Sequence, residues 1–263
     1  MKISVVTPSF NQAVFLERTL RSIHAQRGDF DLEHWVIDGG STDGSVEILE
    51  RWADNLQFVS EADRGQSHAL NKGIARVTGE VIVWLNSDDI LLPGALATVA
   101  QYFTEYPDIR WAYGRCKIID EHDREIRKPI TWYKNLLLRR YNYTKLLIEN
   151  YISQPSTFFR KSFYDEVGGV DESLVYDMDY DLWLRFGRIA PAGVIDAELA
   201  AFRFYTECKT GGAIDPTLKV AHDLSRKYAE AIGRPWAAKI NYWLYYRRTS
   251  LIYRLMAKRD KTT

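Results

Sequence analysis

Two adjacent carboxylates, Asp88 and Asp89, stand at the end of an apolar run and are well placed for chemistry. The run, over residues 80–85, is typical of a buried strand. Mg²⁺ and Mn²⁺ prefer oxygen ligands, and one or two carboxylates often hold them while substrate phosphates complete the shell. Short acidic residues also begin turns and cap helices, and Pro93-Gly94 makes that the preferred explanation on this segment alone. The pair predicts either a metal site for a phosphorylated ligand or a turn.

A second group of acids, Asp177, Asp179 and Asp181, leads into an apolar pattern with helical spacing. Acids at a helix N-terminus stabilise the positive end of the helix dipole, which is the better explanation for at least one of Asp177 and Asp181. A carboxylate within hydrogen-bond reach of a hydroxyl group can also take its proton as a general base. This group predicts a helix start, a catalytic base, or both.

The N-terminal half contains the elements that must position the first acidic pair. Short strands are expected over residues 2–8, 32–38, 56–60 and 80–85. Helical patterns separate them at residues 13–26, 45–52 and 66–77. Asn11 is available as the N-cap of the first helix. The alternation predicts an α/β fold with a mostly parallel Rossmann-like sheet, helices on both faces, and polar loops that converge on one crevice at the carboxyl ends of the strands.

The ordered motifs over roughly the first 210 residues resemble the family 2 glycosyltransferases, which are nucleotide-sugar-dependent enzymes with the GT-A fold. The motifs are Thr7-Pro8-Ser9-Phe10-Asn11, Asp38-Gly39-Gly40-Ser41-Thr42-Asp43, Asp63-Arg64-Gly65-Gln66, Ala69-Leu70-Asn71-Lys72-Gly73, the acidic pair, and Asp179-Tyr180-Asp181-Leu182-Trp183. The resemblance implies a GT-A domain over residues 1–212 and a C-terminal helical extension over residues 213–263, outside the match.

The resemblance implies a pocket for the donor nucleotide. Its expected residues are Thr7, Pro8, Ser9, Asp38, Asp63, Arg64 and Asp88. Asp38 would accept a hydrogen bond from the base, although it could instead cap its own turn. A surface ion pair explains Asp63 and Arg64 equally well. Asp43 suits the N-cap of the helix that follows it.

The resemblance also implies a divalent metal, Mn²⁺ or Mg²⁺, on Asp89 and Asp88, where it would act as a Lewis acid toward the donor diphosphate. The common family pattern is Asp-x-Asp, and this chain departs from it because Asn86 stands at the first position. We therefore expect fewer protein carboxylates on the metal, and weak metal binding without nucleotide.

Asp179 matches the general base of the family, although Met178 replaces a frequent glutamate and Asp181 stays open as an alternative. Gln154 and Ser156 are expected to contact the acceptor, with a polar strand end as the equal alternative. Lys209 lies in a glycine-containing segment that resembles the mobile C-terminal loop of the family, from which it would reach the diphosphate. The implied reaction is a single-step inverting transfer from a nucleoside-diphosphate sugar, UDP-sugar by preference, to a saccharide or lipid-linked acceptor.

Composition fits one compact enzyme, since 263 residues with 46% hydrophobic content can bury a sizeable core. The net charge of +0 argues against nucleic acid as a partner. Cys116 and Cys208 are consistent with free thiols in a reducing cytoplasm. Because no apolar run approaches the roughly 20 residues of a membrane span, we expect a cytoplasmic location.

The tail from Lys239 onward mixes Tyr, Trp and Leu with Arg and Lys. This mixture suits peripheral binding at the inner face of a membrane, and it suits packing on the catalytic domain or on a second copy equally well. Assembly of a cell-envelope or extracellular polysaccharide would be the natural setting. Two other functions remain open, a nucleotidyltransferase and a non-catalytic sugar-nucleotide-binding module.

Overall fold

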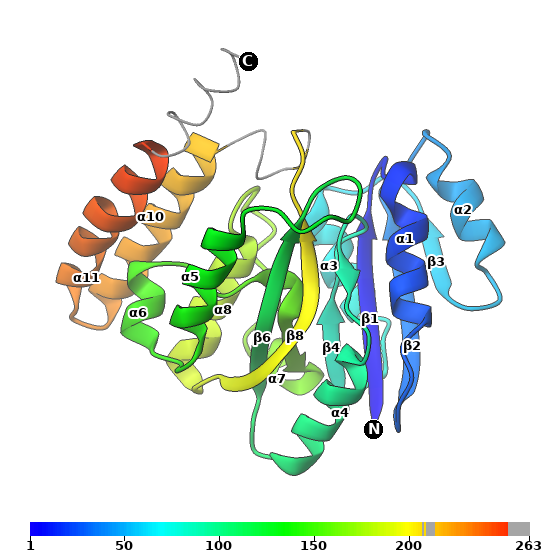
Figure 1. Ribbon diagram of the computed structural model, residues 1–263, viewed down its shortest axis with the longest axis horizontal. Coiled ribbons are helices and arrows are strands. Elements are labelled where there is room, and N and C mark those ends of the chain that lie inside the picture. Colours follow the sequence, from blue (N-terminus) through cyan, green and yellow to red (C-terminus); the bar gives the residue numbers. More distant parts are fainter. Residues whose placement is uncertain (207, 209–213, 252–263) are drawn as a thin grey trace.

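One eight-stranded sheet runs through the molecule, as the computed structural model in Figure 1 shows. The structure describes residues 1–206, 208 and 214–251. The strands in chain order are β1 (Lys2–Ser9), β2 (Asp31–Asp38), β3 (Gln57–Ser60), β4 (Val81–Trp84), β5 (Ile90–Leu91), β6 (Trp111–Ile119), β7 (Thr157–Arg160) and β8 (Gly193–Arg203).

The strand order in the sheet is β3-β2-β1-β4-β7-β6-β8-β5. Strands β1 to β4 are parallel, β7 is antiparallel to both of its neighbours, and β8 is parallel to β6. The carboxyl ends of β1, β2, β3, β4, β6 and β8 therefore lie at the same edge, where loops gather. This arrangement confirms the predicted α/β fold with a mostly parallel sheet.

The helices match the predicted alternation in the N-terminal half and continue beyond it. They are α1 (Ala13–His24), α2 (Ser45–Arg51), α3 (Gln66–Ile74), α4 (Ala95–Glu105), α5 (Lys128–Leu138), α6 (Tyr143–Ile148), α7 (Lys161–Glu166), α8 (Met178–Ile189), α10 (Ile214–Ala231) and α11 (Pro235–Ile240). A 3₁₀ turn, η1 (Gln154–Ser156), precedes β7, and a π-helical segment, η2 (Asn241–Arg247), follows α11.

Both faces of the sheet are apolar because helices cover both faces. Alternate residues of one strand enter different cores: Val6 packs with α3, α8 and α10, whereas Val5 packs with α1 and α4. The same alternation places Trp84 in the first core and Val83 in the second. A strand that is buried on both faces has a continuous run of apolar residues. This burial explains the apolar run over residues 80–85, which stops shortly before the acidic pair.

Two local predictions were wrong. Asn11 does not cap α1: it has a φ of 51°, and its side-chain oxygen accepts from the N–H of Thr42 at 2.9 Å. Asp43, which lies in the loop after β2, binds the N-terminus of α1 instead: its carboxylate accepts from the N–H of Ala13 at 2.9 Å. The polar strand end considered for Gln154 and Ser156 is instead the turn η1: β7 begins only at Thr157, because Pro155 cannot donate a ladder hydrogen bond.

The C-terminal helices pack on the sheet domain through polar and apolar contacts. Tyr228 of α10 donates to Asp181 of α8 at 2.7 Å, and Ser225 donates to the Leu147 carbonyl of α6 at 2.6 Å. Asn241, which is fully buried, donates to the Ile148 carbonyl at 2.8 Å. Over the part of the tail that the structure describes, these contacts agree with the alternative that the tail packs on the rest of the chain. No helix in residues 1–206 or 214–251 is long and apolar enough to cross a membrane.

Candidate active site

The carboxyl end of β1 holds three of the predicted nucleotide-binding residues, Thr7, Pro8 and Ser9. Thr7 is fully buried, and its hydroxyl lies 3.1 Å from Nε2 of His34 on β2. Ser9 is 4% exposed, and its hydroxyl has no hydrogen-bond partner among the described residues. A buried hydroxyl without a partner is uncommon in proteins. A ligand that enters beside Ser9 would supply the missing partner.

Asp38 is fully buried and holds the loop that follows β2. One oxygen accepts from the Ser41 hydroxyl at 2.5 Å, and the other accepts from the Gly40 N–H at 3.1 Å, the Ser41 N–H at 2.8 Å and the Ser60 hydroxyl at 2.7 Å. These are the bonds of a residue that caps its own turn. The structure thus assigns Asp38 a local structural role, and its contact with a base stays a prediction.

Asp63 and Arg64 lie in the loop after β3, at the same edge of the sheet. Asp63 accepts from the Gly65 N–H at 2.7 Å, and its second oxygen lies 3.0 Å from the point where a Cβ would stand on Gly39. This contact places the loops after β2 and β3 side by side. Arg64 is exposed and forms an ion pair with Glu172 at 2.6 Å, which is the surface ion pair considered above.

Asn86 uses all of its hydrogen-bonding capacity at the carboxyl end of β4. Its oxygen accepts from the Gln66 amide and from the Trp84 indole, each at 2.8 Å. Its nitrogen donates to the Gln154 side-chain oxygen at 3.1 Å and to Asp89 at 3.4 Å. A carboxylate could not make the last two bonds because it has no N–H to donate. The amide at this departure from the family pattern therefore has a geometric reason.

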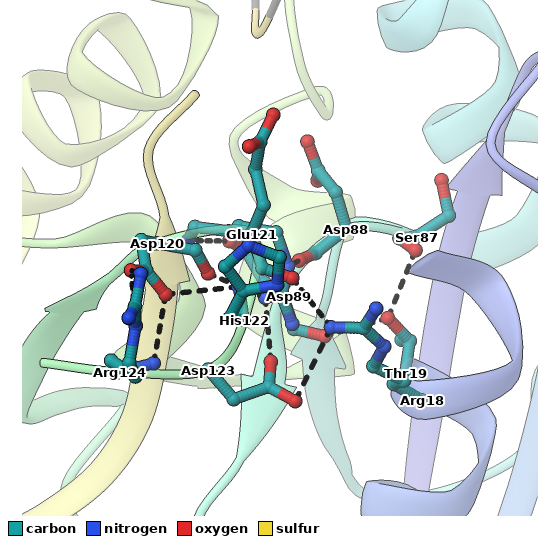
Figure 2. A network of polar contacts seen from close by, with 11 residues as sticks. Arg18, Thr19, Ser87, Asp88, Asp89, Asp120, Glu121, His122, Asp123 and Arg124 are labelled. Atoms are coloured by element: carbon teal, nitrogen blue, oxygen red, sulfur yellow. Dashed lines mark hydrogen bonds and ion pairs between the residues drawn. The ribbon is translucent and has the colours of Figure 1, made fainter. Parts of the chain in front are cut away.

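The acidic pair divides into a buried and a half-buried carboxylate. Asp89 is fully buried and accepts from the backbone N–H of Arg203 at 2.8 Å. Asp88 is half-buried and points out of the surrounding polar network, on the same side as Glu121 (Figure 2). Burial raises the pKa of both carboxyl groups, and the charge of Asp88 adds to the rise in the pKa of Asp89. Of the two predicted metal ligands, Asp88 is the one that faces outward.

Arg203, at the end of β8, is the internal cation that holds this loop. Its side chain is fully buried, donates to the Asp88 carbonyl and the Asp120 carbonyl, each at 2.8 Å, and forms an ion pair with Asp123 at 2.5 Å. The positive charge of Arg203 acts to lower the pKa of both acids, against burial. From the other side, the Thr19 hydroxyl of α1 lies 2.9 Å from the Ser87 carbonyl (Figure 2).

Sequence reasoning missed Arg203 and Tyr205. The Tyr205 hydroxyl lies 3.0 Å from Asp88 Oδ2 and 3.0 Å from the Gln12 amide, so it joins the loops after β1, β4 and β8. An arginine directly after the apolar run at residues 199–202 was the one available signal, since a charged group at a buried strand end requires a partner.

The second acidic group divides in the same way as the first. Asp181 is 2% exposed and fully engaged, with Arg185 at 2.8 Å on one oxygen and Tyr228 at 2.7 Å on the other. Asp179, in the first turn of α8, is half-buried. Asp177 is the N-cap residue of α8, but its side chain makes no capping hydrogen bond. These positions favour Asp179 over Asp181 as a group that a substrate can reach.

Gln154 and Ser156, the predicted acceptor contacts, are both buried in η1. Ser156 is fully buried and donates to the Gly114 carbonyl at 3.0 Å, so it stabilises the sheet and does not reach a surface. That prediction is corrected. Gln154 is 9% exposed and connects Asn86 to the Trp84 carbonyl, which makes it part of the acidic loop's support. Lys209, the predicted diphosphate contact, lies outside the described residues.

The donor set around Asp88 fits an ion that is shared with a substrate. Within the described ranges, no three histidine, cysteine, aspartate or glutamate side chains are grouped closely enough to hold a metal ion. One outward-facing carboxylate with substrate phosphates is nevertheless an arrangement that Mg²⁺ and Mn²⁺ accept. The residues therefore suit a metal that arrives with a diphosphate.

Comparison with known families decides the identity of the chain. The family model described as glycosyl transferase family 2 matches residues 4–168, which are more than half of the chain. The chain belongs to glycosyl transferase family 2. This membership confirms the resemblance inferred from the ordered motifs. The matched region runs from β1 to the turn after α7, and it includes the acidic pair.

Curated relatives of the chain are also glycosyltransferases. An uncharacterised glycosyltransferase of Mycobacterium tuberculosis is 30% identical over 204 residues, which are 76% of this chain and 74% of the relative. The amylovoran biosynthesis glycosyltransferase AmsE of Erwinia amylovora is 29% identical over 173 residues, or 65% of this chain and 63% of the relative. The chain spans only 41% of an uncharacterised glycosyltransferase of Nostoc sp., to which it is 34% identical over 135 residues, or 50% of this chain.

Solved structures share the fold at low sequence identity. A crystal structure of S. aureus TarS in complex with UDP-GlcNAc has a TM-score of 0.63 and 16% identity, over 85% of this chain and 66% of that one. The mannosyltransferase PcManGT from Pyrobaculum calidifontis, in complex with GDP-Man and Mn²⁺, has a TM-score of 0.60 and 20% identity, over 91% of this chain and 72% of that one. These similarities confirm the GT-A fold.

Proposed function

We propose that this family 2 enzyme is an inverting, metal-dependent glycosyltransferase of the hexosyltransferase type. It would move a sugar from a nucleoside-diphosphate sugar, UDP-sugar by preference, to a saccharide or lipid-linked acceptor. The observation that carries the proposal is the division of each acidic group. Asp89 and Asp181 are buried and hydrogen-bonded, while Asp88 and Asp179 are half-buried and face outward or stand at a helix start. A metal-assisted transfer needs one accessible carboxylate to hold the ion and another to act as the base, and Asp88 and Asp179 would supply them.

The donor nucleotide is proposed to bind over the loops after β1, β2 and β3. The partnerless Ser9 hydroxyl supports this position, as does the contact between Asp63 and Gly39 that joins two of the loops. TarS with UDP-GlcNAc and the mannosyltransferase with GDP-Man show that proteins of this fold take such donors. Thr7, Pro8, Asp38 and Arg64 complete the proposed pocket.

Asp88 is proposed to hold the divalent ion together with the donor diphosphate. When bound, the ion would act as a Lewis acid that stabilises the charge on the departing nucleoside diphosphate. Asp89 is proposed to act through the loop, because its carboxylate already binds the Arg203 backbone. The Mn²⁺ in the mannosyltransferase complex supports a metal in this fold.

Asp179 is proposed as the general base. It would take the proton from the acceptor hydroxyl while the new bond to the anomeric carbon forms and the bond to the diphosphate oxygen breaks. Attack on the face opposite the leaving group inverts the anomeric centre. The buried bonds of Asp181 to Arg185 and Tyr228 keep that neighbour out of the reaction.

The helical segment that includes η2 carries exposed apolar side chains that suit a membrane surface. Trp243 is 64% exposed, Leu244 55% and Leu251 58%, and Arg247 lies 5.7 Å from the Trp243 ring. Aromatic, leucine and arginine side chains on one helical segment suit an interface with anionic lipid. We therefore propose a cytoplasmic enzyme that binds the inner face of a membrane and acts in polysaccharide or cell-envelope synthesis.

Thermal unfolding with UDP, GDP, dTDP and CMP, each with and without Mn²⁺, tests the donor and metal assignments, because a ligand that binds only the folded state raises its stability. We expect one nucleotide to raise Tm only when Mn²⁺ is present. In the Asp88→Asn variant, we expect this metal-dependent rise in Tm to be lost. A protein stabilised by none of them would contradict the proposal. Release of pyrophosphate from a nucleoside triphosphate would reveal a nucleotidyltransferase instead.

A further inference from the structure

Lys134 is a half-buried lysine on α5 whose hydrogen-bonding capacity is largely unused. Its ammonium group lies 3.4 Å from the Ser153 hydroxyl, at the upper limit for a hydrogen bond. Within the described ranges this is its only hydrogen bond, although an ammonium group carries three donors. Trp132, on the same helix, is in contrast 68% exposed. Lys134 therefore brings an under-used cation inside the molecule.

Lys134 lies within electrostatic range of the proposed general base, Asp179. Burial lowers the pKa of Lys134, and the charges of Cys116, Glu149 and Asp179 oppose that change. Burial and the charge of Asp89 raise the pKa of the Cys116 thiol to about 12. Lys134 therefore lies within electrostatic range of Cys116, Glu149 and Asp179, and Cys116 lies within range of Asp89.

Hydrogen bonds and one step along the chain also connect Lys134 to the acidic pair. Ser153, which Lys134 contacts, directly precedes Gln154, and the Gln154 side chain accepts from Asn86 at 3.1 Å. Asn86 in turn donates to Asp89. Glu149 does not neutralise Lys134 by a direct ion pair, since its carboxylate accepts from Tyr133 at 2.8 Å and contacts Arg248 at 3.4 Å. Through Ser153, the cation therefore lies next to the side chains that support the acidic loop.

We propose that Lys134 binds a phosphate oxyanion of a substrate during transfer. This assignment rests on the proposed function. Charge-assisted hydrogen bonds from a partly desolvated ammonium group to phosphate are strong, and an oxyanion would supply the acceptors that Lys134 lacks. The oxyanion has two possible sources, the diphosphate of the donor and a phosphate that belongs to the acceptor. As the bond from the anomeric carbon to the diphosphate oxygen breaks, the electron pair stays on that oxygen and the acceptor proton passes to Asp179.

Titration calorimetry on the full chain tests this role with Lys134→Met and Lys134→Gln, which remove the charge, and with Lys134→Arg, which keeps it. Lys128→Met is the matched control, because Lys128 is exposed on the same helix. The ligands are pyrophosphate, UDP with Mn²⁺, and inorganic phosphate added to protein saturated with UDP and Mn²⁺. We expect at least about tenfold weaker binding to both neutral variants, either of UDP and pyrophosphate together or of the added phosphate alone, and little change for the remaining ligand or ligands.

The three titrations separate the two sources. Weaker binding of UDP and pyrophosphate assigns Lys134 to the donor diphosphate, whereas unchanged UDP binding with weaker binding of added phosphate assigns it to the acceptor. Neutral variants that bind all three ligands as tightly as Lys128→Met does would overturn the inference. A wild-type protein that binds no nucleotide would contradict the proposed function, and the pyrophosphate titration would still decide the role of Lys134.

Discussion

Asn86 shows how one side chain can fix the geometry of a loop, here the loop that carries the acidic pair. It accepts two hydrogen bonds and donates two, and the partners come from α3, β4, η1 and the acidic pair. An aspartate would keep the accepted bonds but would face the Gln154 oxygen and the Asp89 carboxylate without a proton between them. The amide is therefore a requirement of this loop in this chain.

Asn86→Asp is expected to destabilise the protein by about 1–3 kcal/mol, because it leaves buried acceptors unpaired and places two carboxylates together. Urea unfolding at pH 7 measures the loss. Asn11→Asp is the control, since Asn11 is exposed and uses only its oxygen toward Thr42, which a carboxylate can replace. Equal stability of Asn86→Asp and wild type would show that the loop tolerates the second charge.

At the residue scale, the sequence indicates where the acids stand but not which of them is buried. Asp88 and Asp89 are neighbours with the same chemistry, and the partner that buries Asp89 lies 114 positions away. Asp181 is taken out of reach by Tyr228, 47 positions away. Ser156 is hidden by contact with Gly114. Contacts between such distant residues depend on the assembled sheet, so a local pattern could not reveal them.

At the scale of elements, the alternation of strands and helices in the N-terminal half could be predicted closely. Both signals are local there: apolar runs mark strands covered on two faces, and apolar residues at helical spacing mark the helices between them. The antiparallel β7 and the parallel pairing of β6 with β8 were not predicted. Their pairing depends on long connections, and nothing in the sequence of these strands specifies which neighbour they choose.

The connection between α8 and α10 gives a prediction at this scale. Tyr228→Phe removes the hydroxyl that satisfies the buried Asp181 carboxylate, so we expect a loss of about 1–3 kcal/mol in the free energy of unfolding. Urea denaturation provides the measurement, with Tyr242→Phe as the control because the described residues offer the Tyr242 hydroxyl no hydrogen-bond partner. If the two variants were equally stable, α10 would not be held through Asp181.

At the scale of the whole molecule, stability depends on a buried histidine beside the proposed nucleotide loop. Burial, with a contribution from the charge of His24, lowers the pKa of His34 to about 3. The unfolded chain has a pKa of about 6.5 for this group, so the neutral form stabilises the folded state. That contribution is complete above about pH 6.5 and is lost progressively as the pH falls toward 3.

His34→Asn is therefore expected to flatten the decline of unfolding free energy between about pH 6.5 and pH 5, where one His34 proton accounts for up to about 1.4 kcal/mol per pH unit. Urea unfolding of the variant and the wild type at several pH values gives the two slopes. Parallel slopes would show that His34 does not titrate with unfolding in this range.

The exposed surface around η2 gives a second prediction for the whole molecule. Deleting the tail from Lys239 onward would remove the buried Asn241, which holds it on α6, so surface substitutions are the better test. The double variant Trp243→Ser, Leu244→Ser is expected to lose binding to anionic liposomes in a sedimentation assay and to keep nucleotide binding. Ile189→Ser, which alters an exposed apolar residue of α8, serves as control. Retained liposome binding by the double variant would contradict the proposal that this surface binds a membrane.

The proposed function depends most directly on Asp179 as the base of an inverting sugar transfer. The decisive measurement is the rate of sugar transfer or donor hydrolysis by Asp179→Asn, once a stabilising nucleotide identifies the donor class. We expect kcat to fall by about two to four orders of magnitude while the affinity for that nucleotide with Mn²⁺ stays unchanged, because the carboxylate acts in the transition state. An unchanged kcat in this variant would contradict the account.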